Sequence, residues 1–105
     1  MSNAQTLNQL LGTALSRTDL QLTEQDAELL KVIVQTGLTR GSSAMRKARL
    51  NPEQMLVSAR KLVEYGLVAA EGETSDDVMI QYAMFSPNAR FLPVVARGLN
   101  IQMAL

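Results

Sequence analysis

The helix between Asn51 and Gly66 has the clearest boundaries in the sequence, and these boundaries restrict what its neighbours can form. Asn51 is a favoured N-cap residue, Pro52 suits the first helical position, and Gly66 suits the left-handed conformation that ends many helices. Across 52–65 apolar residues recur every three or four positions, which predicts one buried face and one polar face. The predicted buried residues are Met55, Leu56, Ala59, Leu62 and Val63.

Three segments before this helix also have helical spacing. Residues 4–16 place leucine and alanine on one stripe of an amphipathic helix. Thr23 is a suitable N-cap for a second helix, which Gly37 ends. A third, short helix is predicted from about residue 42 to residue 48.

After the helix 52–65 the apolar spacing changes. Residues 67–70 are typical of a strand and residues 78–85 of a longer partner strand, and the polar segment between them is short enough to close a hairpin. A last helical region is predicted to begin at Ser86 and Pro87 and to be interrupted near Pro93, with a C-terminal helix over 94–105. The sequence therefore predicts a mainly α fold with a small β-hairpin.

Composition narrows the function classes. With 105 residues, 47% of them hydrophobic, residues 1–105 are expected to form a single domain. The chain has neither cysteine nor histidine, which excludes disulfides, thiol nucleophiles, imidazole bases and zinc sites with nitrogen or sulfur ligands. We expect no metal, no cofactor and no enzymatic activity. No apolar run approaches the roughly 20 residues that span a bilayer, and no leader precedes the first helix, so we expect a cytoplasmic protein that does not contact a membrane.

Charge is balanced overall but segregated along the chain. Ten Lys and Arg residues match ten Asp and Glu residues. Between Arg40 and Lys61 there are six bases and one acid, whereas Glu64 to Asp77 holds five acids and no base. Separate blocks of opposite sign indicate partners more clearly than the net charge does.

A short helix, a tight turn that holds Leu50 and the capped helix 52–65 follow one another within residues 42–68, which end in the phrase LVEYGLV. Together with residues 82–90, this run resembles the winged helix-turn-helix family, in particular bacterial MarR-like and ArsR-like regulators. The resemblance covers residues 22–92. It implies a winged-helix core with an extra N-terminal and an extra C-terminal helix.

The resemblance also implies that helix 52–65 enters the major groove of double-stranded DNA. Gln54 is suited to adenine, Val57 to a thymine methyl group, and Lys61 to guanine or a phosphate. Ser58 is suited to a base or a phosphate. The candidates for contacts to DNA phosphates are Arg40, Ser42, Ser43, Arg46, Lys47, Arg49 and Arg60.

The predicted wing departs from the family pattern. Wings of this family often carry a basic residue, but this one carries four acids and no base: Glu71, Glu73, Asp76 and Asp77. A winged-helix module that binds a basic protein through the acidic wing is therefore an alternative to DNA binding. An accessory role in DNA partition or conjugation is a further alternative, and the sequence has no signature that identifies a small-molecule effector.

The leading prediction is a homodimeric, sequence-specific transcriptional regulator, most simply a repressor. A dimer is expected because apolar residues are abundant at both ends of the chain. The candidate interface residues are Leu7, Leu10, Leu11, Val94, Val95, Leu99, Ile101 and Met103. In the competing interpretation, the two terminal helices cover the core of one monomer.

Overall fold

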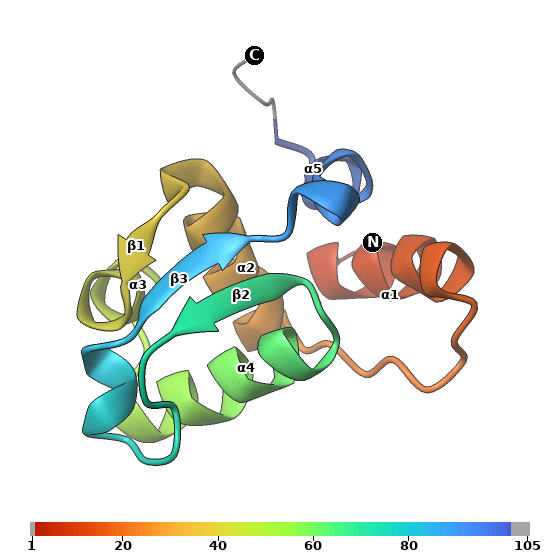
Figure 1. Ribbon diagram of the computed structural model, residues 1–105. Coiled ribbons are helices and arrows are strands. Elements are labelled where there is room, and N and C mark those ends of the chain that lie inside the picture. Colours follow the sequence, from red (N-terminus) through yellow and green to blue (C-terminus); the bar gives the residue numbers. More distant parts are fainter. Residues whose placement is uncertain (1, 102–105) are drawn as a thin grey trace.

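Residues 2–101, which a computed structural model describes, form five α-helices and a three-stranded antiparallel sheet (Figure 1). The predicted mainly helical fold with a small sheet is confirmed. In chain order the elements are α1 (Asn3–Leu15), α2 (Glu24–Thr36), β1 (Thr39–Arg40), α3 (Gly41–Lys47), α4 (Pro52–Glu64), β2 (Val68–Glu71), the 3₁₀ turn η1 (Met79–Gln81), β3 (Met84–Pro87), the 3₁₀ turn η2 (Ala89–Phe91) and α5 (Leu92–Leu99). None of the helices in this part of the chain is long and apolar enough to cross a membrane.

Local capping chemistry sets the helix boundaries. The side chain of Thr23 accepts a hydrogen bond from the backbone N–H of Asp26, and the carboxylate of Asp26 accepts one from the N–H of Thr23. Asn51 and Gln54 make the same reciprocal pair at the start of α4. Each pair satisfies two N–H groups that have no partner inside the helix. Gly66 has a φ of 76°, the left-handed conformation predicted for it.

The last helical region changes from the 3₁₀ turn η2 to α5 at Leu92, and Pro93 lies directly after this change, where the interruption was expected. Pro93 lies in the first turn of α5, where its missing N–H removes no hydrogen bond within the helix. The helix ends at Leu99, and Asn100 follows with a left-handed φ of 55°. Residues 102–105 of the predicted helix 94–105 lie outside the described part of the chain.

The predicted hairpin is wrong in its second strand. In the sheet order β1-β3-β2, β3 begins only at Met84, and residues 79–81 form η1 instead. A strand would put Ile80 and Tyr82 on one face, but Ile80 is fully buried and Tyr82 is 68% exposed. Ile80 packs so close to Gly41 that a Cβ there would overlap the Ile80 carbonyl. Packing against α3 therefore overrides the strand preference of this segment.

The two terminal helices pack against each other on the side of the molecule away from α3 (Figure 1). A Cβ on Gly98 would lie 2.7 Å from Cδ2 of Leu7, so α1 and α5 are in close contact. Four predicted dimer residues are buried in this core: Leu7, Leu11, Val95 and Leu99. Their assignment to a dimer interface is wrong, because their apolar surface is already covered within one chain.

Candidate nucleic-acid interface

The turn between α3 and α4 is tight and fixed by backbone hydrogen bonds. Arg49 has a left-handed φ of 59°, and the N–H of Leu50 bonds to the carbonyl of Met45 at 2.9 Å. This geometry ends α3 and reverses the chain. Asn51 then caps α4 directly, so the two helices are held at a set angle. They form the helix-turn-helix that the sequence predicted.

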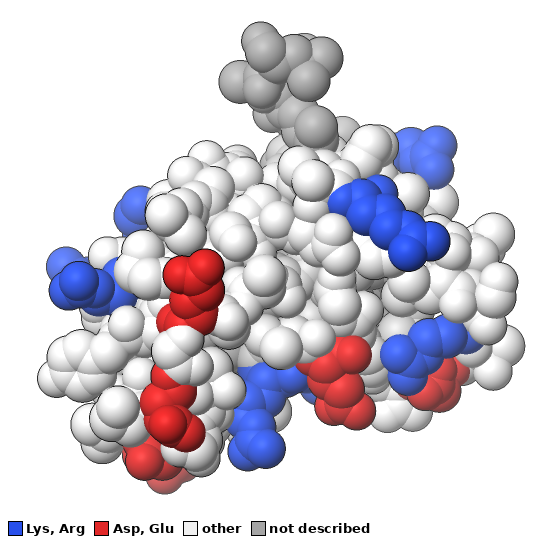
Figure 2. Space-filling model, viewed as in Figure 1, with Lys and Arg blue, Asp and Glu red and all other residues white. Residues whose placement is uncertain are grey.

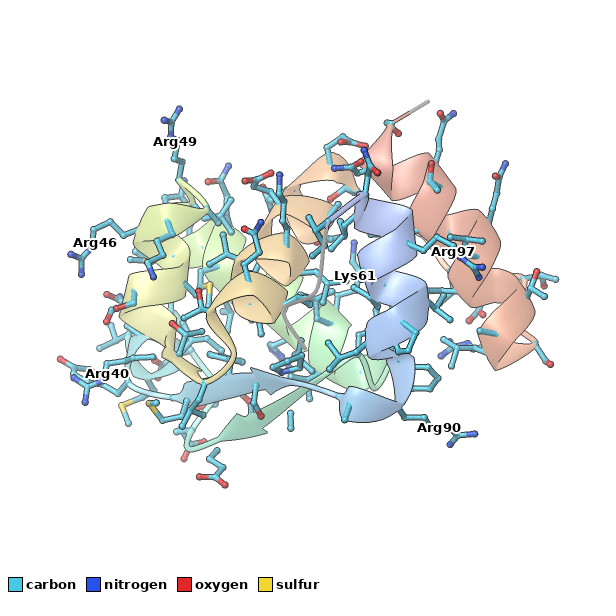
Figure 3. The ribbon with its side chains drawn as sticks, turned by 90° about the horizontal axis from the view of Figure 1, so that it is seen from above. Arg40, Arg46, Arg49, Lys61, Arg90 and Arg97 are labelled. Atoms are coloured by element: carbon cyan, nitrogen blue, oxygen red, sulfur yellow. The ribbon has the colours of Figure 1, made fainter. Side chains whose placement is uncertain are left out.

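Four exposed basic residues surround α3 and the turn, and we call them the basic cluster: Arg40, Arg46, Lys47 and Arg49. Within residues 2–101 the ion pairs are Arg17–Asp19 and Lys61–Asp26. No carboxylate in this range therefore lies within 4.0 Å of the charged groups of the basic cluster. Figure 3 shows Arg40, Arg46 and Arg49 projecting outward from the α3 side, while Arg90 and Arg97 lie on other parts of the surface. The basic cluster is therefore a patch of unpaired positive charge.

The other predicted phosphate contacts differ in exposure. Ser42 and Ser43 are half-buried in the first turn of α3. Arg60 is exposed on α4 and lines a shallow hollow of about 290 Å³ between α4 and the loop after β2. The other lining residues are Val63, Glu64 and Thr74.

Lys61 points into the molecule and not outward. Its Nζ lies 2.7 Å from Oδ2 of Asp26 and 3.3 Å from the carbonyl oxygen of Gln21. The Lys61 side chain is 26% exposed, and that of Asp26 is 1% exposed. Lys61 therefore ties α4 to the start of α2, and its predicted base contact would require breaking a largely buried ion pair.

Ser58 is fully buried, so its prediction as an outward, DNA-contacting residue is wrong. Its hydroxyl accepts a hydrogen bond of 2.7 Å from Nε2 of Gln25. The buried residues of α4 are Met55, Ser58, Ala59 and Leu62, whereas Val63 is 36% exposed. The helix is thus rotated about its axis from the predicted orientation, toward the polar side chains at the start of α2.

Gln54 is exposed, but its carbonyl oxygen is already used. Oε1 accepts the N–H of Asn51 at 2.9 Å in the capping pair of α4. A two-bond contact to adenine needs both the amide oxygen and the amide nitrogen of glutamine. Gln54 can make that contact only by leaving the cap, so the fold opposes its predicted role.

Two residues of α4 remain free on the outward face in its first half. Val57 is 60% exposed, as predicted, although large apolar side chains on this helix are otherwise mostly covered. Glu53 lies one turn earlier and is also exposed. Residues four apart share a face of a helix, so Glu53 and Val57 form one short outward row.

The buried carboxyl of Asp26 is held in its charged form. Desolvation by burial alone would raise the pKa of Asp26, but the hydrogen bonds that its carboxylate accepts from Lys61 and from the Thr23 backbone lower the pKa below its ordinary value of 3.8. Oδ2 accepts the Lys61 bond, and within residues 2–101 no hydrogen-bond donor reaches Oδ1. This carboxyl anchors α4 without access to a ligand from solvent.

Sequence reasoning missed Gln25 and Asp26 as residues that position α4. By its position alone, Asp26 fits the first turn of α2, where a negative charge is favourable. The available signal is its spacing, because Asp26 stands three and four residues before Leu29 and Leu30, on the apolar stripe of α2. A carboxylate on a buried stripe needs a cationic partner.

The acidic wing has a structural role as well as a charge. Asp76 accepts hydrogen bonds from the N–H groups of Val78 and Met79 at 3.0 and 2.7 Å, which starts η1. Figure 2, viewed as Figure 1, shows acidic side chains gathered on the side of the molecule that carries the wing. Val78, Met79 and Tyr82 are exposed next to them, at 57%, 40% and 68%. The wing therefore presents an apolar and acidic surface.

The helix-turn-helix and the β2–β3 wing together define a winged-helix fold, and solved structures share it. Two variants of ZitR from Lactococcus lactis match with TM-scores of 0.61 and 0.60 at 19% and 20% identity, each over 95% of this chain and 75% of theirs. A third ZitR structure, in complex with DNA, matches with a TM-score of 0.53 at 19% identity, over 90% of this chain and 71% of that one. No protein-family model and no curated protein matches the chain.

In residues 2–101 no group of three or more Asp or Glu side chains is placed to hold a metal ion. The described residues instead place the exposed face of α4 beside the basic cluster, whose cations have no carboxylate partner in residues 2–101. That combination suits a polyanion with grooves.

Proposed function

We propose that this protein binds double-stranded DNA through the outward face of α4 and the basic cluster, and that it regulates transcription. The observation that carries the proposal is the basic cluster, which is exposed, unpaired within residues 2–101 and next to a helix whose outer face is free. Unpaired cations bind phosphates with release of counterions, and this supplies nearly all of the non-specific affinity of proteins for DNA. The ZitR complex with DNA supports the proposal through the shared fold.

Fluorescence anisotropy with a mixed pool of duplex DNA, over a series of salt concentrations, tests this function. We expect binding that weakens steeply as salt increases, and that weakens further in the double variant Arg46→Ala/Lys47→Ala. The matched control is Arg90→Ala/Arg97→Ala, which removes the same charge from exposed residues elsewhere (Figure 3). Equal losses in both variants, or no binding at about 50 mM salt, would contradict the proposal.

A homodimer that acts as a repressor is the finer form of this proposal. Three of the predicted interface residues are only partly buried and keep apolar surface available: Leu10, Val94 and Ile101. Met103 lies outside the described residues. Sedimentation of the wild type and of Leu10→Glu at several concentrations tests the dimer, which we expect the substitution to weaken. A monomer at every concentration would contradict it.

The second candidate function is binding of a basic protein through the wing. It is favoured by the exposed Val78, Met79 and Tyr82 beside the acids. The variant Glu71→Gln/Glu73→Gln separates the two functions. If the wing lies near DNA, removing its negative charge strengthens DNA binding at low salt. If the wing serves a protein partner, DNA affinity stays the same.

A further inference from the structure

We infer that Glu53 and Val57 are the residues that select the DNA sequence, and that they recognise a cytosine and a thymine on one strand. This inference rests on the proposed DNA binding and identifies its specificity. It replaces three of the four base contacts expected from the sequence, because Ser58 is buried, Lys61 is tied to Asp26 and the Gln54 carbonyl caps α4.

The position of the two residues favours them. Recognition helices of helix-turn-helix proteins contact bases mainly with residues near their N-termini. Glu53 and Val57 lie in the first half of α4 and are both exposed. Within residues 2–101 no ion pair holds Glu53. Nothing in the described fold therefore competes with DNA for either side chain.

The chemistry of each side chain selects one base. A carboxylate among phosphates is repelled unless it meets a donor, and cytosine offers its N4 amino group in the major groove. The branched apolar side chain of Val57, 60% exposed, is complementary to the C5 methyl group of thymine. Both groups face the major groove, and Glu53 and Val57 lie in one row on α4, so the contacts are expected on nearby bases of one strand.

Helix geometry sets the spacing of the two bases. Four residues of α-helix rise about 6 Å, and base pairs are stacked about 3.4 Å apart along a strand. The two contacts are thus expected at positions about two base-pair steps apart. The recognised element has a cytosine and a thymine in that register, with the neighbouring phosphates bound by the basic cluster.

The test selects binding sites from duplexes with a randomised central segment, using the wild type, Val57→Ala and Glu53→Ala. Alanine has a higher helix propensity than valine, so the variants are expected to keep α4 intact. We expect the wild type to enrich a cytosine and a thymine in the stated register, Val57→Ala to lose the thymine and Glu53→Ala to lose the cytosine by about tenfold. Val63→Ala, on the same helix, is the matched control and should leave the site unchanged.

Replacing the selected thymine by uracil removes only its methyl group and sharpens the test. The wild type should lose affinity by about fourfold, the equivalent of one buried methyl group, while Val57→Ala should bind both duplexes equally. Sequence-selective binding that neither substitution changes would overturn this inference and leave DNA binding intact. Absence of any duplex binding by the wild type would overturn both.

Discussion

Two groups of polar residues flank the helix-turn-helix, and they differ in what their charges contact. The basic cluster consists of cations that have no carboxylate partner within residues 2–101. The second group, which we call the anchor, lies between α2 and α4 and consists of Gln25, Asp26, Ser58 and Lys61. Lys61 resembles the cluster residues in the sequence, yet its charge is neutralised inside the fold. Residue type alone therefore does not show which basic side chains are free to bind a ligand, because that depends on their partners in the fold.

Removing the carboxylate of the anchor should have the largest effect. We expect Asp26→Ala to lower the free energy of unfolding by about 3 kcal/mol, because it leaves Lys61 without its partner and breaks the capping pair with Thr23. This lies at the lower end of the range for buried pairs, since Lys61 is 26% exposed and can be hydrated. Urea denaturation measures the change. A loss below about 0.5 kcal/mol, typical of surface positions, would show that the anchor does not hold α4.

The basic cluster should show the opposite behaviour. We expect Arg46→Ala/Lys47→Ala/Arg49→Ala to weaken DNA binding about 100-fold, if each lost charged contact is worth about 1 kcal/mol. The slope of log affinity against log salt should fall by about 0.9 for each contact. Stability should change little, because these side chains are exposed and unpaired in residues 2–101. If the triple variant unfolded and its remaining folded fraction still bound DNA, the basic cluster would serve stability and not binding. That result would contradict the assignment of the two groups.

Low pH should reduce the stability that the anchor contributes and should leave the basic cluster unaffected. The pKa of Asp26 in the folded chain is below its ordinary value of 3.8, so the carboxyl binds a proton more readily when the chain unfolds. Its contribution to stability is complete above pH 3.8 and is lost as the pH falls through the lower, folded pKa. We expect the stability difference between the wild type and Asp26→Asn to shrink over this acidic range. Denaturation at a series of pH values checks it, and a constant difference would contradict it.

The exposed ion pair should have the smallest effect. Arg17 and Asp19 lie 2.6 Å apart with side chains 36% and 64% exposed, and the hydrogen bond from Arg17 lowers the pKa of Asp19. Solvent and salt screen such a pair. We expect Asp19→Asn to leave the midpoint of thermal unfolding unchanged within error. A loss comparable to that of Asp26→Ala would mean that burial does not distinguish these ion pairs.

The boundaries of the helices could be predicted because caps act locally. Thr23, Asn51 and Gly66 each satisfy groups within a few residues of themselves. The start of the second wing strand could not be predicted from the sequence. Ile80 packs against α3, which is distant in the sequence, and this packing favours the turn η1 over a strand. The burial of Leu7 between the terminal helices could not be predicted either, because Leu7 and Gly98 come into contact only when the chain is folded.

The order of the helices, the capped helix α4 and the gathering of positive charge near it follow from the sequence, because periodicity and capping depend on neighbouring residues. Which face of α4 meets solvent follows instead from contacts with residues distant in the sequence. A helix can rotate about its axis at little local cost, so its orientation depends on the partners it meets. Here Gln25 and Asp26 bind Ser58 and Lys61, turning them inward and leaving Glu53 and Val57 outside.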